Sequence, residues 1–169
     1  MEESSSDLES MKMYTILLAE DSQTDASLVK QYFRKAGILN SFQDVDDGAK
    51  TIDYLAGNGI YSDRARYPFP ILLLLDLNMP RKSGWEVLEW LHHHPPSEPL
   101  GIVVLTGEKN IQIMNRAYKL GAHSFLVKPL QFEDFVNLIK CVREIQLDSE
   151  IDLHHSPSFF NLELKPSAD

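Results

Sequence analysis

Residues Ile71 to Leu75 form an unbroken apolar run that stops at an acid, Asp76. A continuous apolar run of this length is typical of a strand that is buried on both faces, as strands are in parallel α/β sheets. Such sheets bind ligands in the crevice beyond the carboxyl ends of their strands, so the position of this acid matters as much as its chemistry. A lone Asp at a strand end more often caps the following turn, but Asp76 is not alone.

Three further apolar runs also end in a polar side chain, which a second acid, a glycine or a proline follows. Glu20 and Asp21 follow the run at 14–19, Thr106 and Gly107 the run at 102–105, and Lys128 and Pro129 the run at 125–127. If the strands are parallel neighbours, these groups converge on one edge of the sheet, where the carboxylates repel one another unless a cation lies among them. Hard oxygen ligands with room for waters suit Mg²⁺. An ammonium and a hydroxyl are what an incoming phosphoryl group needs.

The order of these groups, each directly after a strand, resembles that of the receiver domain of two-component response regulators. The resemblance covers roughly residues 14–145. It implies that Asp76 is the phospho-accepting nucleophile. It also implies that Asp21, Asp76 and the backbone carbonyl of Asn78 bind Mg²⁺, while Glu20 acts largely through a coordinated water.

The same resemblance assigns the remaining groups at the strand ends. Thr106, Gly107 and Lys128 are expected to bind the phosphoryl oxygens. Phe125 stands at the position of an aromatic switch residue, which turns inward when Thr106 moves, but it lacks the phenol of the tyrosine often found there. The Lys128–Pro129 peptide resembles one that is cis in this family, which is expected to aim the amine inward.

Two alternatives share parts of this pattern. A haloacid-dehalogenase-like phosphatase also uses an Asp nucleophile after a buried strand, but it needs a second Asp two residues further on as general acid, and this chain has Asn78 there. A flavodoxin-like binding module that is never phosphorylated is expected to have lost one of the acids or Lys128. This chain keeps all of the acids and the lysine.

Apolar residues at helical spacing alternate with the apolar runs along the chain. Helices are expected at 25–36, 49–56, 85–91, 110–120 and 132–145, and a weak strand at 41–45. Five strands that alternate with five helices predict an α/β fold with a doubly wound, five-stranded parallel sheet of the flavodoxin-like type. The segment at 57–70 is expected to be a long loop.

We divide the chain into a polar, disordered N-terminus at 1–12, a receiver domain at 13–147 and a C-terminal extension at 148–169. The extension carries Phe159, Phe160, Leu162 and Leu164, which make it too apolar for a simple solubilising tail. We expect these residues to support a homodimer.

Composition limits the partners. The formal net charge of −9 opposes nucleic-acid binding, and the basic pairs at 34–35 and 81–82 are expected to be solvated helix and loop ends. No run approaches the roughly 20 apolar residues of a membrane span. The single cysteine, Cys141, and the absence of a secretory signal fit a cytoplasmic location.

The resemblance also implies a partner and an output. The phosphoryl donor is expected to be a sensor histidine kinase. The sequence at 76–82, the long loop and the C-terminal extension look like those of the small response regulators that partner bacterial phytochromes. No enzymatic output is expected beyond phosphotransfer and autodephosphorylation, so the output is expected to be a surface that changes on phosphorylation.

Overall fold

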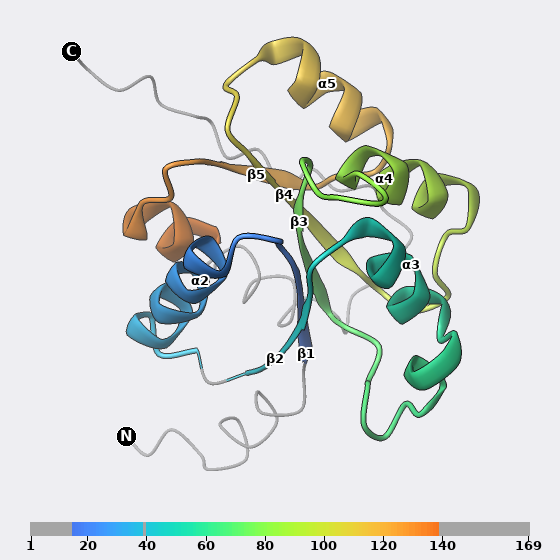
Figure 1. Cartoon of the computed structure of the whole chain (residues 1–169). Helices are drawn as coiled ribbons and strands as arrows, with labels where there is room; N and C mark the ends of the chain where they lie inside the picture. The colour runs from blue at the N-terminus through green and yellow to red at the C-terminus, as the bar shows by residue number, and fades with distance from the viewer. Residues whose placement is uncertain (1–14, 39, 139–169) are drawn as a thin grey trace, which may run out of the picture.

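The computed structural model describes residues 15–38 and 40–138. Within these residues, five parallel strands form one sheet in the order β2-β1-β3-β4-β5 (Figure 1). The strands are β1 (Thr15–Ala19), β2 (Ser41–Val45), β3 (Leu72–Asp76), β4 (Gly101–Thr106) and β5 (Ser124–Val127). This is the strand order of the flavodoxin-like doubly wound fold, so the predicted fold class is confirmed.

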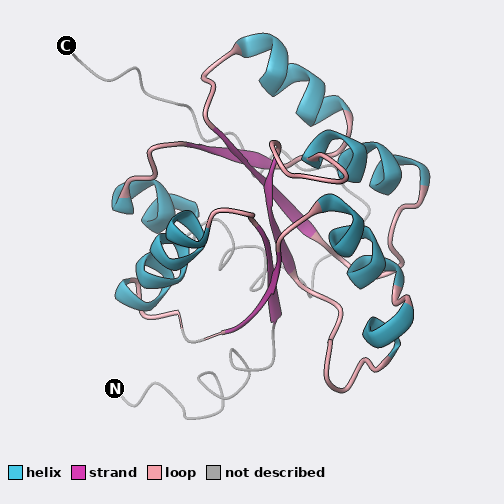
Figure 2. Ribbon diagram, viewed as in Figure 1, coloured by secondary structure: helices cyan, strands magenta, loops and turns pink. Residues whose placement is uncertain are grey.

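Helices connect the strands and cover both faces of the sheet (Figure 2). They are α2 (Gln23–Lys35), α3 (Gly48–Ala56), α4 (Gly84–His93), α5 (Ile111–Lys119) and a helix over 132–138 at the end of the described chain. Side chains of α2 and of the helix over 132–138 share one core with the sheet, and side chains of α3, α4 and α5 share the other. Each helix therefore buries one side against the sheet.

The two cores explain the unbroken apolar run in β3. Leu73 and Leu75 point into the core under α3, α4 and α5, whereas Leu72 and Leu74 point into the core under α2. Successive side chains of a strand point to opposite faces. Because both faces are covered, every position of β3 is buried. An alternation of apolar and polar residues would place polar side chains in one of the two cores, so the strand is apolar up to Asp76.

The register of the sheet brings the strand ends to one edge. Ala19 pairs with Leu75, Asp76 with Leu105, and Thr106 with Val127. The residues that follow β1, β3, β4 and β5 therefore leave the sheet at the same level. This edge is where the predicted site lies.

The segment at 57–70 is more ordered than a simple loop. It contains the 3₁₀ helix η1 (Gly59–Ser62), and the ring of Tyr61 lies 5.0 Å from that of Tyr54 in α3. Arg64 donates from Nη1 to the carbonyl of Tyr54 at 2.8 Å and from Nη2 to that of Leu55 at 3.0 Å. The segment thus donates to carbonyls in the last turn of α3, where no further helical turn follows to supply N–H groups.

Several predictions fall on residues outside the described ranges. They concern the disordered N-terminus at 1–12, the end of the last helix at 139–145, Cys141 and the extension at 148–169 with its apolar side chains. Within the described ranges, no helix combines the length and the apolar character needed to cross a membrane.

Candidate functional site

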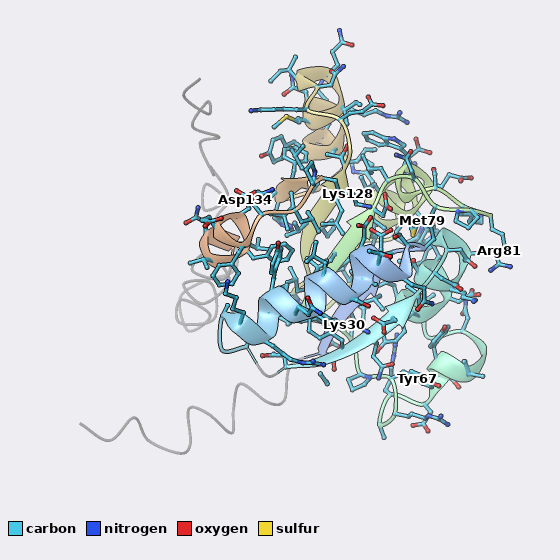
Figure 3. All side chains as sticks on the ribbon, turned by 60° about the vertical axis from the view of Figure 1, so that its left-hand side comes forward. Lys30, Tyr67, Met79, Arg81, Lys128 and Asp134 are labelled. Carbon is cyan, nitrogen blue, oxygen red and sulfur yellow. The ribbon has the colours of Figure 1, made fainter. Side chains whose placement is uncertain are left out.

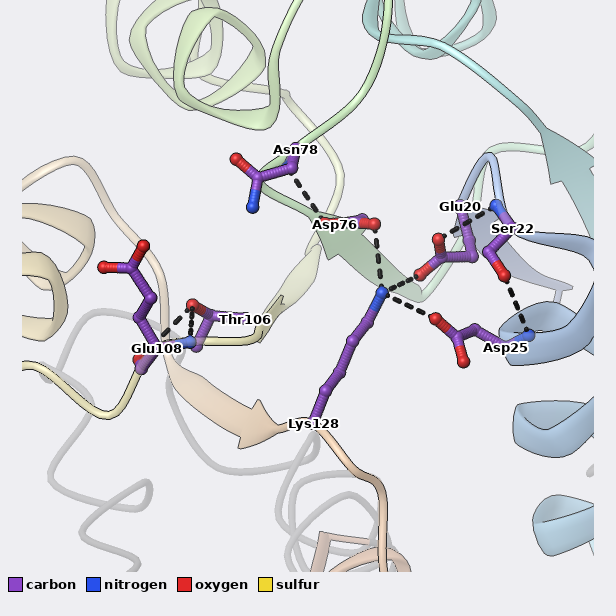
Figure 4. Close-up of polar contacts among 8 residues, drawn as sticks. All are labelled: Glu20, Ser22, Asp25, Asp76, Asn78, Thr106, Glu108 and Lys128. Atoms are coloured by element: carbon purple, nitrogen blue, oxygen red, sulfur yellow. Dashed lines mark hydrogen bonds and ion pairs between the residues drawn. The ribbon is translucent and has the colours of Figure 1, made fainter.

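Asp76 ends β3 and is almost completely buried, with 4% of its surface exposed. Its Oδ1 accepts the backbone N–H of Asn78 at 2.9 Å, and its Oδ2 accepts a hydrogen bond from Lys128 Nζ at 3.1 Å (Figure 4). The strand holds its backbone, and these two bonds fix the carboxylate. Asp76 is therefore presented at the sheet edge in one orientation.

The chain beyond Asp76 turns sharply into α4. Ser83 and Glu86 form a capping box at the start of this helix, in which the Ser83 N–H donates to Glu86 at 2.7 Å. The Gly84 N–H donates to the carbonyl of Leu77 at 3.0 Å. A Cβ at Gly84 would lie 2.3 Å from the backbone oxygen of Asp76, so the turn needs glycine at this position.

Lys128 follows β5, and the peptide bond between it and Pro129 is cis. Its Nζ donates to Glu20 Oε2 at 2.8 Å, to Asp25 Oδ2 at 3.0 Å and to Asp76 Oδ2 at 3.1 Å. An ammonium has three N–H groups, so all of its donors are used. Partial burial lowers the pKa of Lys128, but the bonds to Glu20, Asp25 and Asp76 outweigh burial and raise that pKa above its usual value. The side chain is therefore a permanent cation.

Glu20 is the most perturbed acid of the site. The pKa of Glu20 is raised to about 7, first by burial and then by contact with the Asp76 carboxyl, while the bonds from Lys128 and the Ser22 N–H act in the opposite direction. Its Oε1 accepts the Ser22 N–H at 3.1 Å. The raised pKa mainly reflects the cost of holding a charged carboxylate in a buried place, to which the neighbouring Asp76 adds.

The acidic residues fit a hard divalent cation. In the described residues, Glu20, Asp21 and Asp76 each offer one carboxylate oxygen, and these oxygens lie within 4.8 Å of one another. Asp21 is exposed, which leaves room for waters. Oxygen donors with several waters are what Mg²⁺ prefers, and a cation there would offset both the burial of the Glu20 carboxylate and its repulsion from Asp76.

Thr106 and Phe125 lie apart from the Lys128 contacts. The hydroxyl of the buried Thr106 accepts the Glu108 N–H at 3.1 Å, and in Figure 4 this pair is separate from Lys128 and its acceptors. Gly107 is exposed. The Phe125 ring is buried and lies 4.6 Å from the ring of Tyr118 in α5. The aromatic side chain at the switch position is thus inside the protein in this structure.

Two contacts near this edge were not expected from the sequence. Asp25 was treated only as the start of a helix, although it follows the acids Glu20 and Asp21 closely in the chain. The pair at 81–82 is exposed, as expected, but the sequence did not indicate that Arg81 also makes a specific contact, in which its Nε donates to the Oδ2 of Asp47 at 2.6 Å. Asp47 is fully buried and caps α3 by accepting the Lys50 N–H at 2.7 Å. The acid at the turn before α3 was the signal for this pair, because a buried carboxylate needs a partner.

Comparison with known proteins identifies the family to which a chain with this arrangement of strand-end residues belongs. Residues 16–140 match the response regulator receiver domain. The chain belongs to the response regulator receiver family. The dehalogenase-like phosphatase is thereby set aside, and the predicted receiver domain is confirmed.

Two curated receiver proteins are similar over most of their length. The probable methanogenesis regulatory protein FilR2 of Methanothrix harundinacea is 31% identical over 140 residues, which cover 83% of this chain and 88% of the relative. The response regulator Rcp1 of Synechocystis is 31% identical over 134 residues, which cover 79% of this chain and 89% of the relative.

Solved receiver structures agree with the fold. A response regulator in red light signalling of R. palustris is 32% identical with a TM-score of 0.69, and the match covers 79% of this chain and 93% of that one. The Mn²⁺-bound form of Rcp1 is 30% identical with a TM-score of 0.65, and the match covers 80% of this chain and 96% of the Rcp1 chain. Receiver domains bind Mg²⁺ at an acidic pocket, and this chain has such a cluster at the corresponding sheet edge.

Proposed function

We propose that this receiver domain accepts a phosphoryl group on Asp76 from a sensor histidine kinase and signals through a surface that changes on phosphorylation. The observation that carries the proposal is the carboxylate of Asp76, which is buried at a strand end and held against Lys128 beside the acids Glu20 and Asp21. Nothing in this chemistry requires a further catalytic side chain, because phosphoryl transfer depends mainly on positioning and charge neutralisation.

The transfer joins one oxygen of Asp76 to phosphorus. As the O–P bond forms, the N–P bond of the phosphohistidine breaks, and its electron pair stays on the imidazole nitrogen. Lys128 carries the positive charge that offsets the phosphoryl oxygens, and the Thr106 hydroxyl, which now donates weakly to the Glu108 carbonyl at 3.4 Å, can donate to them once it turns from Glu108. The product is an acyl phosphate, whose lability suits a reversible signal.

The proposed metal ligands are Asp21, Asp76 and the backbone carbonyl of Asn78, with Glu20 acting through a water. Bound Mg²⁺ supplies further charge neutralisation at the phosphoryl oxygens. The clustered oxygens of Glu20, Asp21 and Asp76 support this assignment, as does the Mn²⁺-bound form of the related Rcp1. The role of the Asn78 carbonyl rests on the family resemblance alone.

The proposed output runs from Thr106 to the outer face of α5 and β5. Movement of Thr106 toward the phosphoryl group repacks Phe125, which contacts the half-exposed Tyr118. We propose that this face, with Tyr118, Lys119 and the exposed side of the last helix, forms the phosphorylation-dependent surface, and that a homodimer forms whose stability depends on the C-terminal extension and is modulated by phosphorylation. A cytoplasmic location is part of the same proposal.

The proposed kinase is of the phytochrome type. Relatives in red light signalling and among phytochrome response regulators support this choice. A phosphotransfer profile of the full chain against several histidine kinases, a phytochrome kinase among them, tests it. Faster transfer from an unrelated kinase would reject the phytochrome assignment and leave the receiver function intact.

The phosphoacceptor is tested with acetyl phosphate and Mg²⁺, followed by intact-mass analysis. One phosphoryl group should be added to the parent and none to Asp76→Asn. The control is Asp53→Asn, which changes an exposed acid in α3 and should be labelled like the parent. Labelling that survives Asp76→Asn would overturn the assignment.

A further inference from the structure

Asp25 reaches the proposed phosphorylation site from a separate element. It is the third residue of α2, its Oδ2 accepts a hydrogen bond from Lys128 Nζ at 3.0 Å, and 34% of its side chain is exposed (Figure 4). It is neither at a strand end nor in the cluster of Glu20, Asp21 and Asp76 that suits a cation. Its charge acts through Lys128.

The local structure explains why Asp25 is free to make this contact. Ser22 caps α2 and accepts the Asp25 N–H at 3.3 Å, so an acid at position 25 is placed to complete a capping box by accepting the Ser22 N–H. At α4, Glu86 does accept the N–H of its cap residue, Ser83. At α2 the Ser22 N–H donates to Glu20 instead. The carboxylate of Asp25 therefore does not bind the Ser22 N–H and binds Lys128 instead.

The three acceptors of Lys128 differ in what they lose when the bond is broken. Glu20 and Asp76 are buried, whereas Asp25 borders on solvent and can be rehydrated. A phosphoryl group on Asp76 needs an N–H from an ammonium whose three donors are already used. Of the three acceptors, Asp25 can therefore lose its bond to Lys128 at the smallest cost, because water replaces the ammonium as its partner.

We infer that Asp25 is a positioning residue that competes with the phosphoryl group for the ammonium of Lys128 and so lowers the affinity of the site for dianionic phosphodonors. The inference rests on the proposed function. Its carboxylate also repels the same dianions directly, so both effects have the same sign. Removal of the charge at position 25 therefore strengthens phosphoryl binding.

The test compares Asp25→Asn with the parent as full chains at saturating Mg²⁺. The affinity for beryllofluoride, a phosphoryl mimic, is measured by calorimetry, and kcat/KM for acetyl phosphate by intact mass. Both should rise by about 3- to 10-fold in Asp25→Asn, the size expected for one partly screened charge. A merely structural role of Asp25 does not tighten binding.

Two matched variants complete the test. Asp25→Glu keeps the charge and should stay within about twofold of the parent. Asp134→Asn removes the same charge from an exposed position on the helix over 132–138 and should leave both quantities unchanged (Figure 3). Parent-like or weaker beryllofluoride binding by Asp25→Asn overturns the inference. A parent that takes no phosphoryl group on Asp76 rejects the proposed function, and the inference with it.

Discussion

The guanidinium of Arg81 pairs with the carboxylate of Asp47, a side chain without any exposed surface. The pair joins the loop after Asp76 to the turn before α3, 34 residues earlier in the chain. A backbone bond of 2.9 Å from the Gly48 N–H to the Lys82 carbonyl lies beside it. Two connections thus hold the segment that leads from Asp76 to α4.

Arg81 has a positive φ of 62°, which L-residues other than glycine rarely adopt. Arg81→Ala removes the partner of a buried carboxylate and keeps the strained backbone. We expect it to lower the free energy of unfolding by about 1–2 kcal/mol, a modest figure because the Arg81 side chain itself is largely exposed. Arg81→Gly relieves the backbone and should lose about 1 kcal/mol less. Urea unfolding measures both, and equal losses would contradict the role of the backbone.

Gly84→Ala tests the close approach of α4 to the end of β3. The added Cβ would lie 2.3 Å from the Asp76 backbone oxygen and 2.7 Å from the Leu77 Cα, so the backbone at the end of β3 has to move. We expect a loss of about 2–4 kcal/mol in stability and a slower phosphorylation of Asp76. Gly107→Ala meets no atom within 4 Å and should keep the thermal midpoint of the parent. Similar midpoints for the two variants would show that the turn tolerates a side chain.

Asp21→Ala tests the metal site. Without Mg²⁺ the variant should have a higher thermal midpoint than the parent, because one of the repelling carboxylates is gone. Mg²⁺ at ten times its dissociation constant should stabilise the parent by about 1.4 kcal/mol and the variant far less. Thermal unfolding in EDTA and in MgCl₂ gives both values. The control, Glu98→Ala, removes an exposed acid elsewhere and should respond to Mg²⁺ as the parent does.

The raised pKa of Glu20 predicts how stability depends on pH in the absence of Mg²⁺. Its folded-state pKa of about 7 exceeds the ordinary 4.5, so the folded protein binds the extra proton. The contribution of Glu20 to stability is therefore complete below about pH 4.5 and is lost as the pH rises through 7. The loss is on the order of 3 kcal/mol, from a shift of the Glu20 pKa from 4.5 to about 7.

Glu20→Gln cannot titrate, so its stability should fall less between pH 5 and pH 8. Urea unfolding of both proteins in EDTA at several pH values gives the free energy of unfolding of each as a function of pH. The effect of the histidines is the same in both proteins and cancels when the two are subtracted. Parallel curves for parent and variant would mean that burial does not raise the pKa of Glu20.

The sequence by itself determined the sheet and the composition of its functional edge. Strands buried on both faces need continuous apolar runs, so β1, β3, β4 and β5 could be recognised without any tertiary information. Each run stops where the chain leaves the core, and the register of a parallel sheet brings those points together. For this reason Asp76, Lys128 and the acids after β1 could be assigned to one place.

Only the tertiary structure decided which side chains meet at that edge. Asp25 and Lys128 are separated by 103 residues, and whether they touch depends on the angle of α2 and on the use of the Ser22 N–H by Glu20. The pairing of Arg81 with Asp47 likewise depends on how two loops pack together. Hydrogen bonds form or fail over a few tenths of an ångström, and local sequence patterns do not fix positions to that precision across the fold.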